Sequence, residues 1–169
     1  MIGAFRNLRD DERGASVIEF AVAAPFLGAL LLGMIDLSSA YSDRLKLEQA
    51  AQRTIELVEQ QRTVSSDYST QLRTEAAAAA GITATTSNPS IRQWLECTPT
   101  DANGNPTGAP VDQGNNTLAS QCPNGTDMPS RYVSVTISKD YTPIIASTYL
   151  GTNSNGKYTL TASAGIRVQ

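Results

Sequence analysis

One carboxylate, Glu19, stands at the start of the most apolar stretch of this 169-residue chain. From Phe20 to Ile35 no residue is charged, and counting back to Ala15 gives about twenty residues, enough to cross a hydrocarbon layer about 30 Å thick. An unpaired acid at the centre of such a layer costs on the order of 2.5 to 3.5 kcal/mol, and less near its edge. Glu19 therefore either has an ionic partner or lies in a first helical turn, where the helix dipole and headgroup water tolerate it.

Cys97 and Cys122 are the only thiols, and both follow the apolar segment. In an exported region they are expected to form a disulfide, because that compartment is oxidising. The bond would close a loop of about 25 residues, worth roughly 3 to 3.5 kcal/mol in loop entropy. The alternative is two free buried thiols.

No other set of residues suggests catalysis. The chain has no histidine, which excludes hydrolase triads and zinc sites that depend on it. The net charge of -3 offers no basic patch for nucleic acid, and the chain has no Gly-rich phosphate loop. The oxygen-rich segment 101–105 is interpreted as a turn rather than a calcium loop. We therefore expect a protein that is not an enzyme, with no cofactor and no metal.

The residues around Glu19 form a constellation: a short polar leader, Gly14, an acid five residues later, then the aromatic Phe20. This resembles the processing site of type IV prepilins of the Tad/Flp branch. The resemblance implies cleavage after Gly14 by a membrane prepilin peptidase, which leaves Ala15 as the new N-terminus. In these families the fifth-position glutamate is thought to neutralise the α-amino group of a neighbouring subunit. That implies an ion pair between Glu19 and Ala15 of a neighbouring subunit.

The chain continues for about 130 residues after Ile35, whereas major Flp pilins resemble little more than the hydrophobic helix. The long form, with Pro25 in the apolar run, two C-terminal cysteines and the sequence Tyr141-Thr142-Pro143, is similar to the TadE family of pseudopilins or minor pilins. The resemblance implies a role in pilus assembly, initiation or adhesion. The implied partners are the prepilin peptidase, the major Flp pilin, other minor pilins, the inner-membrane assembly platform and membrane lipid.

Helical periodicity continues beyond the apolar run and predicts one helix from about Ser16 to Gln61. Pro25 lacks an amide donor, so a kink or local loosening is expected there. The outer half should turn an apolar stripe towards a head; this stripe consists of Leu37, Tyr41, Leu45, Ala51, Ile55 and Val58.

A second helix is predicted from Tyr68 to Ala80, capped by Ser66 or Asp67 and closed by Gly81. Alternating apolar residues predict strands at 131–138 and 157–168, and weaker patterns suggest two more at 82–86 and 91–96. Trp94 is assigned a role in the core or against the disulfide. The predicted fold class is α+β and pilin-like, with a long N-terminal helix, a short second helix and a small antiparallel sheet packed on the long helix.

Four regions follow: a leader at 1–14, a transmembrane half-helix at 15–36, an amphipathic half-helix at 37–62 and an exported head at 63–169. The arginines of the leader favour a single pass through the bacterial inner membrane with the head in the periplasm, followed by incorporation in an extracellular pilus. The alternative is a signal peptide cleaved after Ala40, which releases a periplasmic binding domain, or an uncleaved membrane anchor. The N-terminus of the mature protein distinguishes these possibilities: Ala15, Tyr41 or Met1.

Overall fold

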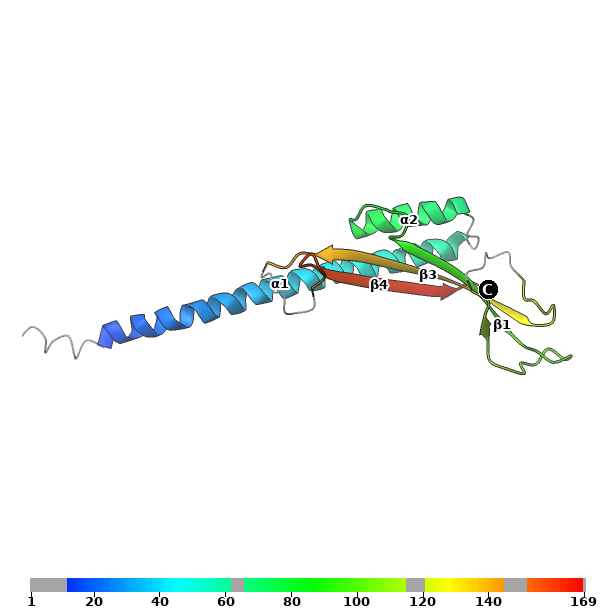
Figure 1. Cartoon of the computed structure of the whole chain (residues 1–169), viewed down its shortest axis with the longest axis horizontal. Coiled ribbons are helices and arrows are strands. Elements are labelled where there is room, and N and C mark those ends of the chain that lie inside the picture. Colours follow the sequence, from blue (N-terminus) through cyan, green and yellow to red (C-terminus); the bar gives the residue numbers. More distant parts are fainter. Residues whose placement is uncertain (1–11, 62–65, 115–120, 145–151, 169) are drawn as a thin grey trace, which may run out of the picture.

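The computed structural model of the chain describes residues 12–61, 66–114, 121–144 and 152–168. It confirms the α+β fold: a long helix carries a head made of a second helix and a four-stranded antiparallel sheet (Figure 1). One half of the long helix projects from the head (Figure 1). In chain order the elements are α1 (Glu12–Gln61), α2 (Ser66–Ala80), β1 (Ser90–Thr98), β2 (Val111–Asp112), β3 (Met128–Tyr141) and β4 (Tyr158–Arg167).

Helix α1 has 50 residues, which corresponds to a length of about 75 Å at 1.5 Å per residue. It begins four residues before the predicted start, at Glu12, and ends at the predicted Gln61. The helix is continuous through Pro25, so the predicted kink stays a prediction.

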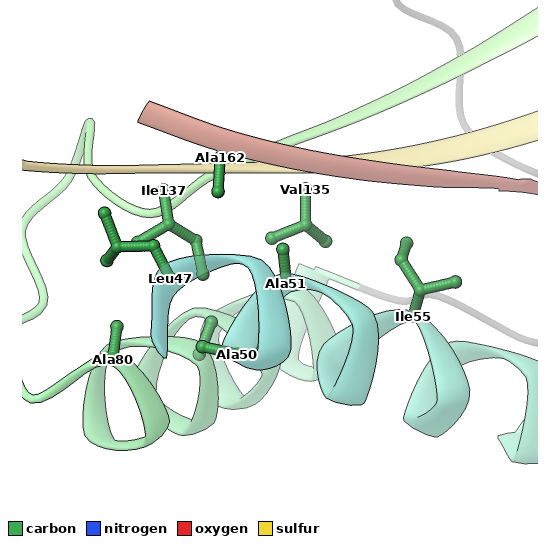
Figure 2. Close-up of a cluster of buried hydrophobic side chains, with 9 residues drawn as sticks. Leu47, Ala50, Ala51, Ile55, Ala80, Val135, Ile137 and Ala162 are labelled. Atoms are coloured by element: carbon green, nitrogen blue, oxygen red, sulfur yellow. The ribbon is translucent and has the colours of Figure 1, made fainter. Parts of the chain in front are cut away.

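The outer half of α1 forms one side of the core. Its buried side chains recur at three- and four-residue spacing, which places them on one helical face. Figure 2 shows this face turned towards Val135 and Ile137 of β3 and Ala162 of β4. The buried residues of α1 are Leu47, Ala50, Ala51, Thr54, Ile55 and Val58.

The predicted apolar stripe is therefore correct only in its second part. Leu37 and Tyr41 are 73 % and 61 % exposed, and Leu45 is also exposed. The sheet covers α1 on the face of Leu47, and these three side chains lie outside it.

Helix α2 starts at Ser66, two residues before its predicted start, and ends at the predicted Ala80. Gly81 adopts a left-handed conformation with φ 65°, and its amide donates to the carbonyl of Ala78. The amide of Ile82 donates to the carbonyl of Ala77, which completes a Schellman cap. The small side chains of Ala76 and Ala80 are buried against α1, so they let the two helices approach closely.

The sheet has the strand order β2-β1-β3-β4. Strand β3 is central, and its alternate residues Val133, Val135 and Ile137 are fully buried against the helices. The predicted strands at 91–96, 131–138 and 157–168 are confirmed as β1, β3 and β4, whereas β2 was not predicted.

The strand predicted at 82–86 is wrong. Ile82 completes the cap of α2, and the chain then forms a loop closed by a bond from the Thr85 amide to the Asn88 carbonyl. The Asn88 side chain takes the place of a strand residue: its Nδ2 donates to the Ser138 carbonyl, and its Oδ1 accepts from the Ser138 amide. Just before the start of β1, the Asn88 side chain therefore pairs with β3 in place of the backbone pairing that the apolar pattern suggested.

Candidate processing and assembly segment

The bond between Gly14 and Ala15 lies in the first turn of α1, because the helix begins at Glu12. Amides of a first turn have no acceptor inside the helix, so cleavage there would leave the remaining helix with its hydrogen bonds nearly intact. Glu19 lies one turn further on, and its side chain is exposed between the exposed Ile18 and Phe20. Within the described part of the chain, no residue forms a hydrogen bond or ion pair with the Glu19 carboxylate.

The half of α1 that follows Glu19 is long and apolar enough to cross a membrane. Its most apolar 18-residue window has a mean hydropathy of 2.1, and none of that window is buried within the chain. Because so many apolar side chains are exposed, this half of the helix needs lipid or other helices around it instead of water. This half is consistent with membrane anchoring. The large exposed apolar side chains between residues 17 and 35 are Val17, Ile18, Phe20, Val22, Phe26, Leu27, Leu30, Leu31, Leu32, Met34 and Ile35.

Where the apolar half ends, the last residues of β3 hold two acids of α1. The hydroxyl of Tyr141 donates to Oδ1 of Asp36 and lies 3.1 Å from the Asp36 carbonyl oxygen. The amide of Ile144 donates to the same Oδ1 at 3.1 Å. The Nζ of Lys139 lies 2.9 Å from Oδ2 of Asp43. We call this group of residues, Asp36, Asp43, Lys139, Tyr141 and Ile144, the helix–head clamp.

The clamp follows from the periods of the two elements. Lys139 and Tyr141 are two residues apart in β3, so both point to the face that carries Ile137 and packs on the helix. Asp36 and Asp43 are seven residues apart in α1, so they lie about two turns apart on the same side of the helix. Two long side chains of the strand therefore reach two successive acids of the helix.

Both ionisable contacts shift pKa values. The hydrogen bond to the Asp36 carboxylate raises the pKa of Tyr141, because the phenolate would lose the bond and face a negative charge. The hydrogen bond and charge of Lys139 lower the pKa of Asp43, with a smaller contribution from Lys46. The Nζ of Lys46 lies 3.5 Å from Oδ1 of Asp43.

The Asp43 pair predicts a pH-dependent stability. Because the folded-state pKa of Asp43 is lowered, its stabilisation is complete above the unfolded pKa of about 4 and is lost as the pH falls through the folded value. We expect Asp43→Asn to lower the free energy of unfolding by about 0.5 to 1 kcal/mol at neutral pH and by nothing in strong acid. Urea unfolding of the full chain in detergent, measured across this range, checks the difference. An exposed acid on the same helix supplies the control: Glu59→Gln should leave the free energy of unfolding unchanged both at neutral pH and in strong acid.

The sequence interpretation missed the acids and the lysine of the clamp, and it used Tyr141 only as part of the resemblance carried by Tyr141-Thr142-Pro143. A signal was present, because Asp36 directly follows the uncharged segment and Asp43 stands two helical turns later. Their partner strand is about 100 residues away, and periodicity gives no information about such a pairing.

Comparison with known families bears on this same helix. The family model of TadE-like proteins matches residues 14–55, which begin at the predicted cleavage site and end inside the core face of α1. This segment of the chain is similar to TadE-like proteins. The match covers about a quarter of the chain. No curated protein and no solved structure matches the chain.

The match associates this helix with the TadE-like proteins of Tad pilus systems. The matched segment contains Gly14, Glu19 and Pro25, and also both acids of the clamp. Helix α2 and the whole sheet lie outside it, so their arrangement comes from the structure alone.

The expected disulfide is present, between Cys97 at the end of β1 and Cys122. Strand β1 ends on the side of the head remote from the apolar half of α1 (Figure 1), so the bond from Cys97 lies there. There it ties the described loops around β2 to the sheet. The segment 101–105 is a turn, as expected: the Asp101 carboxylate accepts from the amides of Asn103 and Asn105.

Loss of this disulfide should destabilise the head. We expect the double variant Cys97→Ser/Cys122→Ser to unfold at a free energy lower by about 2 to 4 kcal/mol, because the unfolded loop of about 25 residues regains its freedom. Thermal unfolding of both proteins with and without a reducing agent provides the comparison. The reductant should lower the thermal unfolding midpoint of the unchanged protein and should not change that of the double variant. A lower midpoint in both proteins would contradict the assigned disulfide.

The prediction for Trp94 is wrong. Trp94 lies on the face of β1 opposite to the buried Leu95, so it points away from the helices. The Trp94 ring stacks on the ring of Tyr132 of β3, with the two centroids 5.1 Å apart. The guanidinium of Arg92, also on β1, lies 5.0 Å from the centroid of the Trp94 ring. The indole N–H donates to Glu96 at 3.0 Å. Trp94 therefore stabilises the outer face of the sheet instead of the core.

Proposed function

We propose that this TadE-like chain is a minor pilin or pseudopilin of a Tad pilus. In this proposal prepilin peptidase cleaves after Gly14, and the processed subunit waits in the bacterial inner membrane with residues 15–36 in lipid. Residues 37–62 and the head at 63–169 stand in the periplasm. The assembly platform then transfers the subunit into a filament with the major Flp pilin and other minor pilins, where it acts in assembly, initiation or adhesion.

One observation carries the proposal: an exposed carboxylate at the start of an unpartnered apolar helix, in a segment that the TadE-like family model matches from Gly14 onward. In a filament, the helix would lose lipid and gain neighbouring helices. Glu19 would then pair with the α-amino group of Ala15 on a neighbouring subunit, so that two buried charges satisfy each other. Phe20 and its apolar neighbours would supply the surrounding contacts.

The clamp also bears on the alternative of a signal peptide cleaved after Ala40. Such a cleavage would remove Asp36, to which Tyr141 and Ile144 of the head are bonded. It would also cut a helix that continues without a break from the apolar half into the core. Both observations favour a head that keeps its N-terminal helix.

N-terminal sequencing of the mature protein tests the proposal. Ala15 at the N-terminus is the expected result, and Tyr41 or Met1 would exclude processing as a pilin. A Gly14→Val variant should remain uncleaved, because a branched side chain replaces the residue at the scissile bond. A Gly28→Ala variant is the matched control: its added methyl group meets no atom within 4 Å, so cleavage should proceed as before.

A further inference from the structure

The base of the head carries an apolar side chain that nothing in the described part of the chain covers. Ile144 lies three residues after the end of β3, and its side chain is 59 % exposed although the preceding Pro143 is buried. We propose that this base, formed by Lys139, Tyr141, Ile144, Lys157 and Tyr158, docks onto the surface of the membrane that α1 crosses. The inference rests on the proposed placement of the apolar half of α1 in lipid.

The depth of Ile144 is set by the clamp. Its amide donates to the Asp36 carboxylate at 3.1 Å, and Asp36 directly follows Ile35, the last residue of the uncharged segment. The Ile144 backbone is therefore held at the level where the apolar half of α1 ends. A bilayer filled by that half places this level at the boundary between hydrocarbon and headgroups.

The chemistry of the base is that of a membrane interface. Tyr141 and Tyr158 stand directly opposite each other in the pairing of β3 with β4, and both are partly exposed. Tyrosine is enriched at headgroup level because its ring is apolar and its hydroxyl is polar. Lysine places its stem along apolar groups while its charge stays in water.

The lysines of the chain gather at this end. There are three: Lys139 and Lys157 flank the tyrosine pair, and Lys46 lies on α1 one turn after Asp43. The other large apolar side chains exposed on the described head, Val111 and Met128, belong to the region of the disulfide at the opposite end. Lipid is the occupant we assign, because the base continues the apolar surface of α1 at the same level.

Depth-dependent fluorescence quenching tests the docking. The full chain is placed in vesicles of phosphatidylethanolamine and phosphatidylglycerol with acyl chains brominated at either a shallow or a deep position. A Trp94→Phe background removes the native fluorophore and keeps an aromatic ring on Tyr132. Single tryptophans are then introduced by Ile144→Trp at the base, Val111→Trp at the opposite end as a control of similar exposure, and Phe26→Trp in the apolar half.

We expect shallow bromines to quench the Ile144→Trp protein, deep bromines to quench the Phe26→Trp protein, and neither to affect the Val111→Trp protein. Quenching of the Phe26→Trp protein without quenching of the Ile144→Trp protein would overturn the docking and leave the membrane helix standing. No quenching of either would overturn both. A third outcome is that lipid bromines do not quench the Ile144→Trp protein and its fluorescence changes only when a second pilus subunit is added. That outcome would assign the base to a protein partner and overturn the lipid assignment.

Discussion

Replacing Glu19 with alanine should abolish incorporation into pili while cleavage after Gly14 continues. In the proposed filament the variant leaves the α-amino group of a neighbouring Ala15 buried without a counter-ion, and breaking a buried pair in this way costs about 3 to 5 kcal/mol. An effect of that size corresponds to a loss of about 100-fold or more in assembled subunit. Immunoblots of sheared pili, compared with the processed protein in the membrane fraction, measure it.

The isosteric Glu19→Gln variant separates charge from shape and should fail as severely as the alanine variant. An exposed acid elsewhere on α1 serves as the matched control, and Glu59→Ala should assemble normally because it lies beyond the apolar half. If the Glu19→Ala protein is cleaved and assembled at the unmodified level, the carboxylate has no role in register. Failure of cleavage itself would move the role of Glu19 from assembly to recognition by the peptidase.

Replacing Leu47 with alanine should produce the largest loss of head stability available from a single truncation on α1. Leu47 is fully buried where the helix meets Ile137 and Ala162 (Figure 2). Truncation of a buried leucine leaves a cavity and costs about 2 to 5 kcal/mol. Urea unfolding of the full chain, followed by circular dichroism, reports the change in the free energy of unfolding.

Leu45 provides a control of identical chemistry two residues away. Its side chain is 38 % exposed on a different face of α1, so Leu45→Ala should cost no more than about 1 kcal/mol. Equal losses from the two variants would mean that the sheet packs on another face of the helix than the structure shows. A larger loss for Leu45→Ala would support the stripe that the sequence pattern suggested.

Local patterns accounted for most of the secondary structure. The spacing of Ala51, Ile55 and Val58 placed them correctly on the core face, and alternation along β3 and β4 predicted which side of each strand packs on the core. The same reasoning failed at Ile82, whose amide completes a helix cap and whose side chain packs against the core from a loop. It also failed at Leu37 and Tyr41, because helical periodicity identifies a stripe without showing where the neighbouring sheet stops covering it.

The sequence by itself determined the elements whose information is local: the uncharged helix half, the constellation of Gly14, Glu19 and Phe20, and the pair of cysteines. Only the tertiary structure decided that β3 returns to α1 and bonds Tyr141 to Asp36 across a separation of 105 residues. It also decided that Trp94 faces outward. Such contacts depend on how a helix of period 3.6 meets a strand of period 2, and each partner's own sequence looks unremarkable until the two are packed together. In the filament proposed above, Glu19 is the residue whose ionic partner a neighbouring subunit supplies.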